Sequence, residues 1–162
     1  MFLLSSLPHD YIPFIQITIA LVFGMILGIE RVLVGRTAGP RTYGLVSMGA
    51  CLATLLSIES VKHFPLPVDP MPMIAAILTG VGFIGAGLIV LHGAKLSGLT
   101  TAAGIWVSAI IGIAIGFQAF NLATFTTFLT LFTFSIMWRI EKNIKKKFSV
   151  DFPEGVNDSG GE

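Results

Sequence analysis

The sequence predicts an all-α polytopic membrane protein with five transmembrane helices. Of its 162 residues, 54% are hydrophobic and only 12% are charged, and this charged fraction is about half of the ~25% found in soluble domains. Residues 42–58, 70–91 and 96–138 form three stretches without any charge. Because about 20 apolar residues are needed to cross ~30 Å of hydrocarbon, these stretches are long enough to span a bilayer.

Five apolar segments, separated by short loops, define the expected helices. They cover residues 11–29, 42–58, 73–91, 100–117 and 122–138. No basic residue precedes Arg31 and no small-residue cleavage site follows the first segment, so we expect a retained anchor rather than a signal peptide. The transmembrane domain is expected over residues 1–147. The tail over 148–162 contains proline, glycine and four acids, and it is expected to be disordered.

The loop charges predict the orientation of the chain. Nine of the ten lysines and arginines follow the first, third or fifth segment, and only Lys62 follows the second. Because basic loops stay on the cytoplasmic side, the N-terminus is expected outside and the C-terminal tail in the cytoplasm. Tyr43 and Trp138 lie at the cytoplasmic ends of their segments, where interfacial aromatic side chains are common.

Small residues recur along the predicted helices. The stretch GVGFIGAG at residues 80–87 has the G-x-G-x-x-G spacing of a nucleotide-binding loop, but no strand can precede it, so we expect no such loop. Inside a membrane, glycine instead lets helix backbones approach closely. The glycines expected at such packing contacts are Gly24, Gly28, Gly82, Gly85, Gly87, Gly104, Gly112 and Gly116.

A weak internal repeat appears when the chain is shifted by 59 residues. The shift superposes Gly28 on Gly87 and Thr42 on Thr101. Five such matches in an apolar sequence can also arise by chance. A real repeat would relate two helix hairpins by an axis along the membrane normal, would bring their loops together on the cytoplasmic side, and would leave the fifth helix as an addition.

The sequence contains no recognised catalytic constellation, and we expect no enzyme activity, no cofactor and no metal site. The histidines lack metal-ligand spacing, and Cys51 is the single cysteine, so it has no disulfide partner within the chain. Glu30 is the acid closest to the apolar region, and an ionisable group at that depth is a functional candidate by default. The structural alternative is an ion pair that only locks the loop, with Arg31, Arg36 or Arg41 as partner.

The start of the fourth helix gathers further candidates. The sequence GLTT begins this helix, where Thr100 or Thr101 can accept hydrogen bonds from the free N–H groups of the first turn. Trp106 lies too deep for the interfacial belt, so we expect it to pack on a neighbour's small residues or to line a cavity. The candidate functional residues are Glu30, Arg31, Arg41, Thr42, Lys95, Thr100, Thr101 and Trp106. Among them, Glu30, Arg41 and the threonine pair are expected to form one cytoplasmic-side site.

The sequence resembles the MgtC/SapB family of bacterial inner-membrane proteins in two segments. They are ERVLVGRTAGPRTYGLVSMGA and GVGFIGAGLIVLHGAKLSGLTTAAGIWVSAIIGIAIG. The resemblance covers about residues 20–118. It rests on the order of the ER pair, the AG-x-RT segment, the GFIGAG stretch and the GLTTAA-x-x-W segment. It implies an inner-membrane helical protein connected with growth at low magnesium and, in some members, with restraint of the F-type ATP synthase.

Two functions fit the sequence. Mg²⁺ prefers hard oxygen ligands, usually with carboxylates, and the membrane domain offers Glu30 beside arginines, which does not favour a magnesium path through one copy. Helix N-termini and arginines on the cytoplasmic side instead attract anions. We therefore expect a regulatory or adaptor protein that binds another membrane component, with a solute or Mg²⁺ transporter as the alternative. The expected partners are the lipid bilayer, another membrane complex such as the F-type ATP synthase, and further copies of this chain, but not nucleic acid.

Overall fold

The chain folds as a bundle of five helices in a computed structural model that describes residues 11–63, 69, 71–92 and 95–148. The helices are α1 (Ile12–Leu33), α2 (Pro40–His63), α3 (Met71–Leu88), α4 (Leu99–Gly116) and α5 (Phe120–Phe148). All five are long and apolar enough to cross a membrane. The predicted all-α class with five transmembrane helices is therefore confirmed, and the chain is a multi-pass membrane protein. Residues 149–162, where we expect a disordered tail, lie outside the described residues.

A short antiparallel hairpin between α3 and α4 is absent from the sequence prediction. Strand β1 (Val90–His92) pairs with β2 (Lys95–Ser97), so the expected third helix, which we extended to residue 91, ends at Leu88 instead. Gly98 follows the hairpin with a φ of +87°. A Cβ at this position would run into the carbonyl group of Leu88, so the turn needs glycine both for its backbone angle and for its close approach.

The beginning of α4 also differs from the prediction. Gly98 is the N-cap residue of α4, and no side chain caps the helix. Thr100 and Thr101 therefore lie inside the first turn, and the expected threonine cap is wrong. The reason is that the left-handed Gly98 starts the helix before the threonines are reached.

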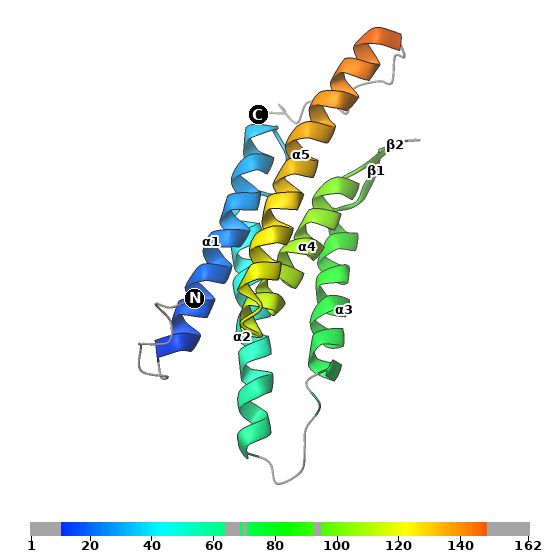
Figure 1. The fold of residues 1–162 in the computed structure, drawn as a ribbon. Coiled ribbons are helices and arrows are strands. Elements are labelled where there is room, and N and C mark those ends of the chain that lie inside the picture. The colour runs from blue at the N-terminus through cyan, green and yellow to red at the C-terminus, as the bar shows by residue number, and fades with distance from the viewer. Residues whose placement is uncertain (1–10, 64–68, 70, 93–94, 149–162) are drawn as a thin grey trace.

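Helix α4 is the centre of the bundle, and the other helices pack around it (Figure 1). Gly104, Ser108, Gly112 and Gly116 lie four residues apart on α4 and are all buried. A Cβ on Gly112 would collide with the backbone of Ser47 on α2. The two backbones are thus in near contact, which is the close approach that small residues allow inside a membrane.

Helices α1 and α2 pack equally closely. A Cβ on Gly24 would meet the carbonyl oxygen of Tyr43, and one on Gly28 would meet the backbone of Pro40. Gly24 and Gly28 therefore let α1 approach α2 closely, as Gly112 lets α4 approach α2. On α3, Gly85 approaches Ala102 of α4 at ordinary van der Waals distance.

Gly82 and Gly87 do not follow this pattern, which corrects the packing role expected for them. Helix α3 turns its buried positions, Val81 and Gly85, toward the bundle. A Cβ added at Gly82 or Gly87 meets no atom within 4 Å in the part of the chain that the structure describes. The physical reason is that α3 lies at one side of the bundle (Figure 1) and packs with only one face.

Polar side chains join the helices inside the bundle. Ser108 Oγ donates a hydrogen bond to the Tyr43 carbonyl oxygen at 2.9 Å, and Tyr43 Oη donates to the Thr101 carbonyl oxygen at 3.2 Å. Tyr43 is 0% exposed, so its expected place in an interfacial aromatic belt is wrong. Gln16 Nε2 donates to the carbonyl oxygens of Ile115 and Gly116 at 2.6 and 3.0 Å, which satisfies the last turn of α4.

Two helical hairpins, α1–α2 and α3–α4, are followed by α5 in the order that the proposed repeat requires. The packing of the superposed residues is not equivalent. Gly28 lies against Pro40, whereas a Cβ at Gly87 would meet no atom of the described residues within 4 Å. The repeat therefore stays a prediction.

Candidate functional site

Three arginines gather at one end of the bundle, which we call the basic end. It is the end where α1 finishes, α2 begins and the β1–β2 hairpin leads into α4 (Figure 1). After α1, Gly35 adopts a φ of +70° and the Arg36 N–H donates to the Arg31 carbonyl oxygen at 2.9 Å. This tight turn brings Arg36 back over the end of α1, while Arg41 follows in the first turn of α2.

A buried ion pair lies at the end of α1. Arg31 Nε donates to Glu30 Oε2 at 2.8 Å, and the whole Arg31 residue is 2% exposed. The Arg31 guanidinium also lies on the ring of Phe134 from α5, 3.9 Å from the ring centroid. Of the three partners open to Glu30 in the sequence, the structure therefore selects Arg31, its neighbour in the chain.

The ion pair leaves two polar atoms without a partner. Glu30 Oε1 and Arg31 Nη1 are both buried, and neither makes a hydrogen bond within the described part of the chain. A buried polar group without a hydrogen bond costs free energy, and such groups call for a structural or functional explanation. The Glu30–Arg31 pair carries no net charge, but it keeps one free acceptor, Glu30 Oε1, and one free donor, Arg31 Nη1.

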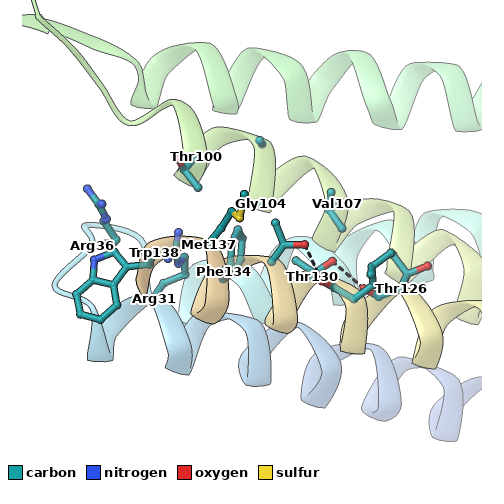
Figure 2. A pocket seen from close by; sticks show the side chains of 13 residues that line it. Arg31, Arg36, Thr100, Gly104, Val107, Thr126, Thr130, Phe134, Met137 and Trp138 are labelled. Atoms are coloured by element: carbon teal, nitrogen blue, oxygen red, sulfur yellow. Dashed lines mark hydrogen bonds between the residues drawn. The ribbon is translucent and has the colours of Figure 1, made fainter. Parts of the chain in front are cut away.

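A cavity of about 480 Å³ begins at Arg31 and runs between α4 and α5 (Figure 2). Arg31, Arg36 and Trp138 gather at one end of it, and Val107 and Thr126 lie toward the other. Its full lining is Arg31, Arg36, Thr100, Ala103, Gly104, Val107, Thr126, Leu129, Thr130, Thr133, Phe134, Met137 and Trp138. The cavity therefore combines a basic end with a long, mostly apolar wall.

Of the residues expected to form one site, which are Glu30, Arg41, Thr100 and Thr101, only Thr100 lines the cavity. Arg31 and Thr100 line the cavity, whereas Arg41 is exposed and does not line it. The arginine that lines the cavity together with Arg31 and Thr100 is Arg36, because the tight turn after α1 brings it back over the end of that helix. Thr101 is buried, and its carbonyl oxygen accepts the hydrogen bond from Tyr43.

The remaining candidates lie elsewhere. Thr42 is half-buried near the start of α2, and Lys95 lies in β2. Trp106 is 42% exposed, and it lines neither the cavity at Arg31 nor a second one between α2 and α3. The expectation that Trp106 packs on a neighbour or lines a cavity stays a prediction.

Sequence reasoning missed the contribution of α5. Thr126, Thr130, Phe134 and Trp138 lie four residues apart and all line the cavity. This i, i+4 spacing, which places side chains on one helix face, was the available signal. Among the described residues, no group of three histidine, cysteine, aspartate or glutamate side chains could hold a metal ion. The free donor of Arg31 instead suits an anionic or carbonyl oxygen.

Comparison with known proteins places these residues in a wider context. The sequence pattern of the MgtC family matches residues 17–143. The putative magnesium transporter YhiD of Escherichia coli K12 is 35% identical over 139 residues, which cover 82% of this chain and 64% of that protein. Protein SapB of Bacillus subtilis is 39% identical over 107 residues, or 63% of this chain and 46% of that protein. Protein MgtC of Salmonella typhimurium LT2 is 38% identical over 112 residues, or 69% of this chain and 46% of that protein.

The chain thus spans between 46% and 64% of the length of these three relatives. No solved structure gives a significant match.

Proposed function

The chain belongs to the MgtC family, and from this premise we propose that it is a regulatory or adaptor protein that binds another membrane component during adaptation to low magnesium. We place it in the bacterial inner membrane, with the basic end in the cytoplasm. The magnesium connection is supported by the family and by one relative that carries the name putative magnesium transporter. The orientation is supported by the arginines at the basic end, since basic loops stay in the cytoplasm.

The observation that carries the adaptor proposal is the uncovered face of α3. This helix is long enough to span the membrane, but only Val81 and Gly85 are buried in it. Gly80, Gly82 and Gly87 have no atom of the described chain near the place where a Cβ would lie. Small residues let another transmembrane helix approach the backbone, so α3 suits the docking of a partner helix.

A crevice beside α3 supports the same proposal. It measures about 440 Å³ and lies between α2 and α3, with Leu45, Gly49, Ala76 and Gly80 among its lining residues. An incompletely packed boundary between two helices offers room for side chains of a docking helix. A subunit of another complex, for which the F-type ATP synthase is one candidate, and a second copy of this chain are the partners that we propose to test.

The second candidate function is magnesium transport, which the name of the Escherichia coli relative favours. Mg²⁺ requires several oxygen ligands in near-octahedral geometry. One oxygen of Glu30 accepts a hydrogen bond from Arg31, and the guanidinium would repel a cation at the same site. The adaptor function is therefore the one that the geometry supports better.

The decisive variant is Gly82→Leu, compared with Ser135→Leu as the control. Both positions are exposed, but Ser135 lies on α5, away from the uncovered face of α3. In a strain that depends on this protein at low magnesium, Gly82→Leu should abolish growth at normal membrane abundance, and Ser135→Leu should support it. Equal growth of the two strains would contradict the adaptor proposal.

Reconstituted vesicles separate the two functions. The adaptor proposal expects no Mg²⁺ flux through the purified chain, measured with a magnesium-sensitive dye inside the vesicles. Mg²⁺ flux would instead support the transporter, and Glu30→Gln at an equal amount of folded protein should then abolish it, because Glu30 Oε1 is buried without a hydrogen-bond partner among the described residues.

A further inference from the structure

We propose that the cavity between α4 and α5 is a binding site for one anionic phospholipid, with the lipid phosphate at Arg31 and Arg36 and an acyl chain along α5. None of the lining residues comes from α3, so this site is separate from the face that we propose for a partner helix.

The polar end of the cavity holds a hydrogen-bond donor without a partner. Arg31 is 2% exposed and lines the cavity, and its Nη1 atom makes no hydrogen bond within the described residues. Glu30 and Phe134 already occupy the Nε edge and one face of the guanidinium. A phosphate oxygen is the partner that guanidinium N–H groups bind most favourably. Arg36 lines the same end and supplies a positive charge that the Glu30–Arg31 pair does not cancel.

The walls of the cavity suit an acyl chain. Val107, Leu129 and Met137 contribute apolar surface. The hydroxyl groups of Thr130 and Thr133 donate to the carbonyl oxygens of Thr126 and Leu129 at 2.7 and 2.9 Å (Figure 2). Because these hydroxyl protons are engaged within α5, the threonines can turn methyl groups toward a ligand without losing a hydrogen bond.

The length of the cavity matches one half of a bilayer. Its lining on α5 extends from Thr126 to Trp138, which is about 18 Å at 1.5 Å per residue. One leaflet contributes about half of the ~30 Å hydrocarbon thickness. A ligand with its charge at the basic end and its tail reaching toward the middle of the membrane fills this space, whereas a free phosphate ion would leave the apolar wall empty.

A transmembrane helix fits the cavity less well than a lipid. The backbone carbonyl groups of a helix in hydrocarbon are already hydrogen-bonded within that helix. Such a helix would cover the apolar wall and leave Arg31 Nη1 without an acceptor. A phospholipid supplies both the acceptor and the apolar tail in one molecule.

The test uses tryptophan quenching by brominated lipids. The chain contains two tryptophans, and Trp138 lines the cavity whereas Trp106 does not. In a Trp106→Phe background, Trp138 is the single fluorophore. The purified full chain is reconstituted into vesicles of phosphatidylcholine and phosphatidylglycerol in equal amounts, with bromine on the acyl chains of one lipid or of the other.

We expect brominated phosphatidylglycerol to quench Trp138 with a preference of about fivefold over phosphatidylcholine, the equivalent of the ~1 kcal/mol that one basic side chain contributes near anionic lipid. Arg36→Gln should remove most of this preference. Ala103→Leu, which places a branched side chain in the cavity wall, should do the same. Arg41→Gln is the matched control, because Arg41 is an exposed arginine at the same end that does not line the cavity, and it should change the preference less than twofold.

Three results would overturn the proposal. Equal quenching by the two lipids would show that the cavity does not select an anionic headgroup. Equal losses with Arg36→Gln and Arg41→Gln would show that only the general surface charge attracts the lipid. Loss of the preference in millimolar inorganic phosphate at constant ionic strength would identify a site for the free anion. Because Gly82→Leu should leave the preference unchanged, failure of the lipid site and failure of the adaptor function can be told apart.

Discussion

The guanidinium of Arg31 lies 3.9 Å from the ring centroid of Phe134, so a buried charge on α1 is held against an aromatic face on α5. A cation–π contact of this kind stabilises by about 2 kcal/mol or more when both groups are desolvated. It also joins the first and last helices of the bundle at the basic end. The contact therefore fixes one end of the cavity and the geometry of the Glu30–Arg31 pair together.

Replacement of the ring should reveal this contact. Phe134→Leu retains an apolar side chain but removes the aromatic face, so we expect the free energy of unfolding to fall by about 2 kcal/mol. Denaturation in mixed detergent micelles, followed by circular dichroism, measures the change. Phe132→Leu is the control, because Phe132 is 51% exposed on the same helix. Equal losses in the two variants would mean that the ring contributes only apolar area.

Neutralisation of Glu30 tests whether the ion pair is structural. Glu30→Gln removes the charge that compensates a nearly buried guanidinium, and breaking a buried pair typically costs about 3 to 5 kcal/mol. We expect membrane abundance and low-magnesium growth to fall together. The double variant Glu30→Gln/Arg31→Gln, which buries no net charge, should recover part of the stability. Wild-type abundance with lost growth in Glu30→Gln would show instead that the carboxylate acts directly in function.

Replacement by alanine should have different effects at two glycines. Gly112→Ala places a methyl group against the Ser47 backbone, whereas Gly82→Ala meets no atom of the described chain within 4 Å. Overpacking costs about 1 to 3 kcal/mol, and backbone cannot move aside as a side chain can. We expect Gly112→Ala to lower the melting temperature in detergent and Gly82→Ala to leave it unchanged. Equal melting temperatures would contradict the close α2–α4 contact.

Gln16 should stabilise the end of α4. Its Nε2 group donates to the Ile115 and Gly116 carbonyl oxygens. In Gln16→Leu the Ile115 oxygen keeps its bond from the Gln118 N–H, but the Gly116 oxygen loses its donor, and an unsatisfied buried acceptor costs about 1 to 3 kcal/mol. Thr18→Val is a suitable control, because the Thr18 hydroxyl bonds only within its own helix, to the Phe14 carbonyl oxygen. Unfolding in detergent should show a lower free energy of unfolding for Gln16→Leu than for Thr18→Val. Equal values would show that the Gln16 hydrogen bonds do not stabilise the protein.

The orientation of the chain is open to a direct test. Reporter fusions after Lys95 and after Lys147 should report the cytoplasm, and a fusion near Lys62 should report the outside, because basic loops remain in the cytoplasm. An alkaline phosphatase and green fluorescent protein pair gives opposite signals on the two sides. Reversed signals at all three positions would invert the membrane orientation without changing the fold.

The sequence by itself determined the class and the number of helices. Uncharged apolar stretches of about 20 residues indicate membrane-spanning helices, because a helix satisfies every backbone polar group within its own segment. The four-residue spacing from Gly104 to Gly116 likewise identified the packed face of α4. These features are local, so composition and periodicity are sufficient to predict them.

Tertiary structure decided which of these local features meet. The four-residue glycine pattern is the same whether a helix packs on a neighbour or lies uncovered, and only the bundle distinguishes Gly112 from Gly82. Arg36 rather than Arg41 lines the cavity because Gly35 turns the chain back over α1. Tyr43 and Phe134 became core residues because α4 and α1 cover them, and such contacts between distant segments leave no signal in the spacing of either segment alone.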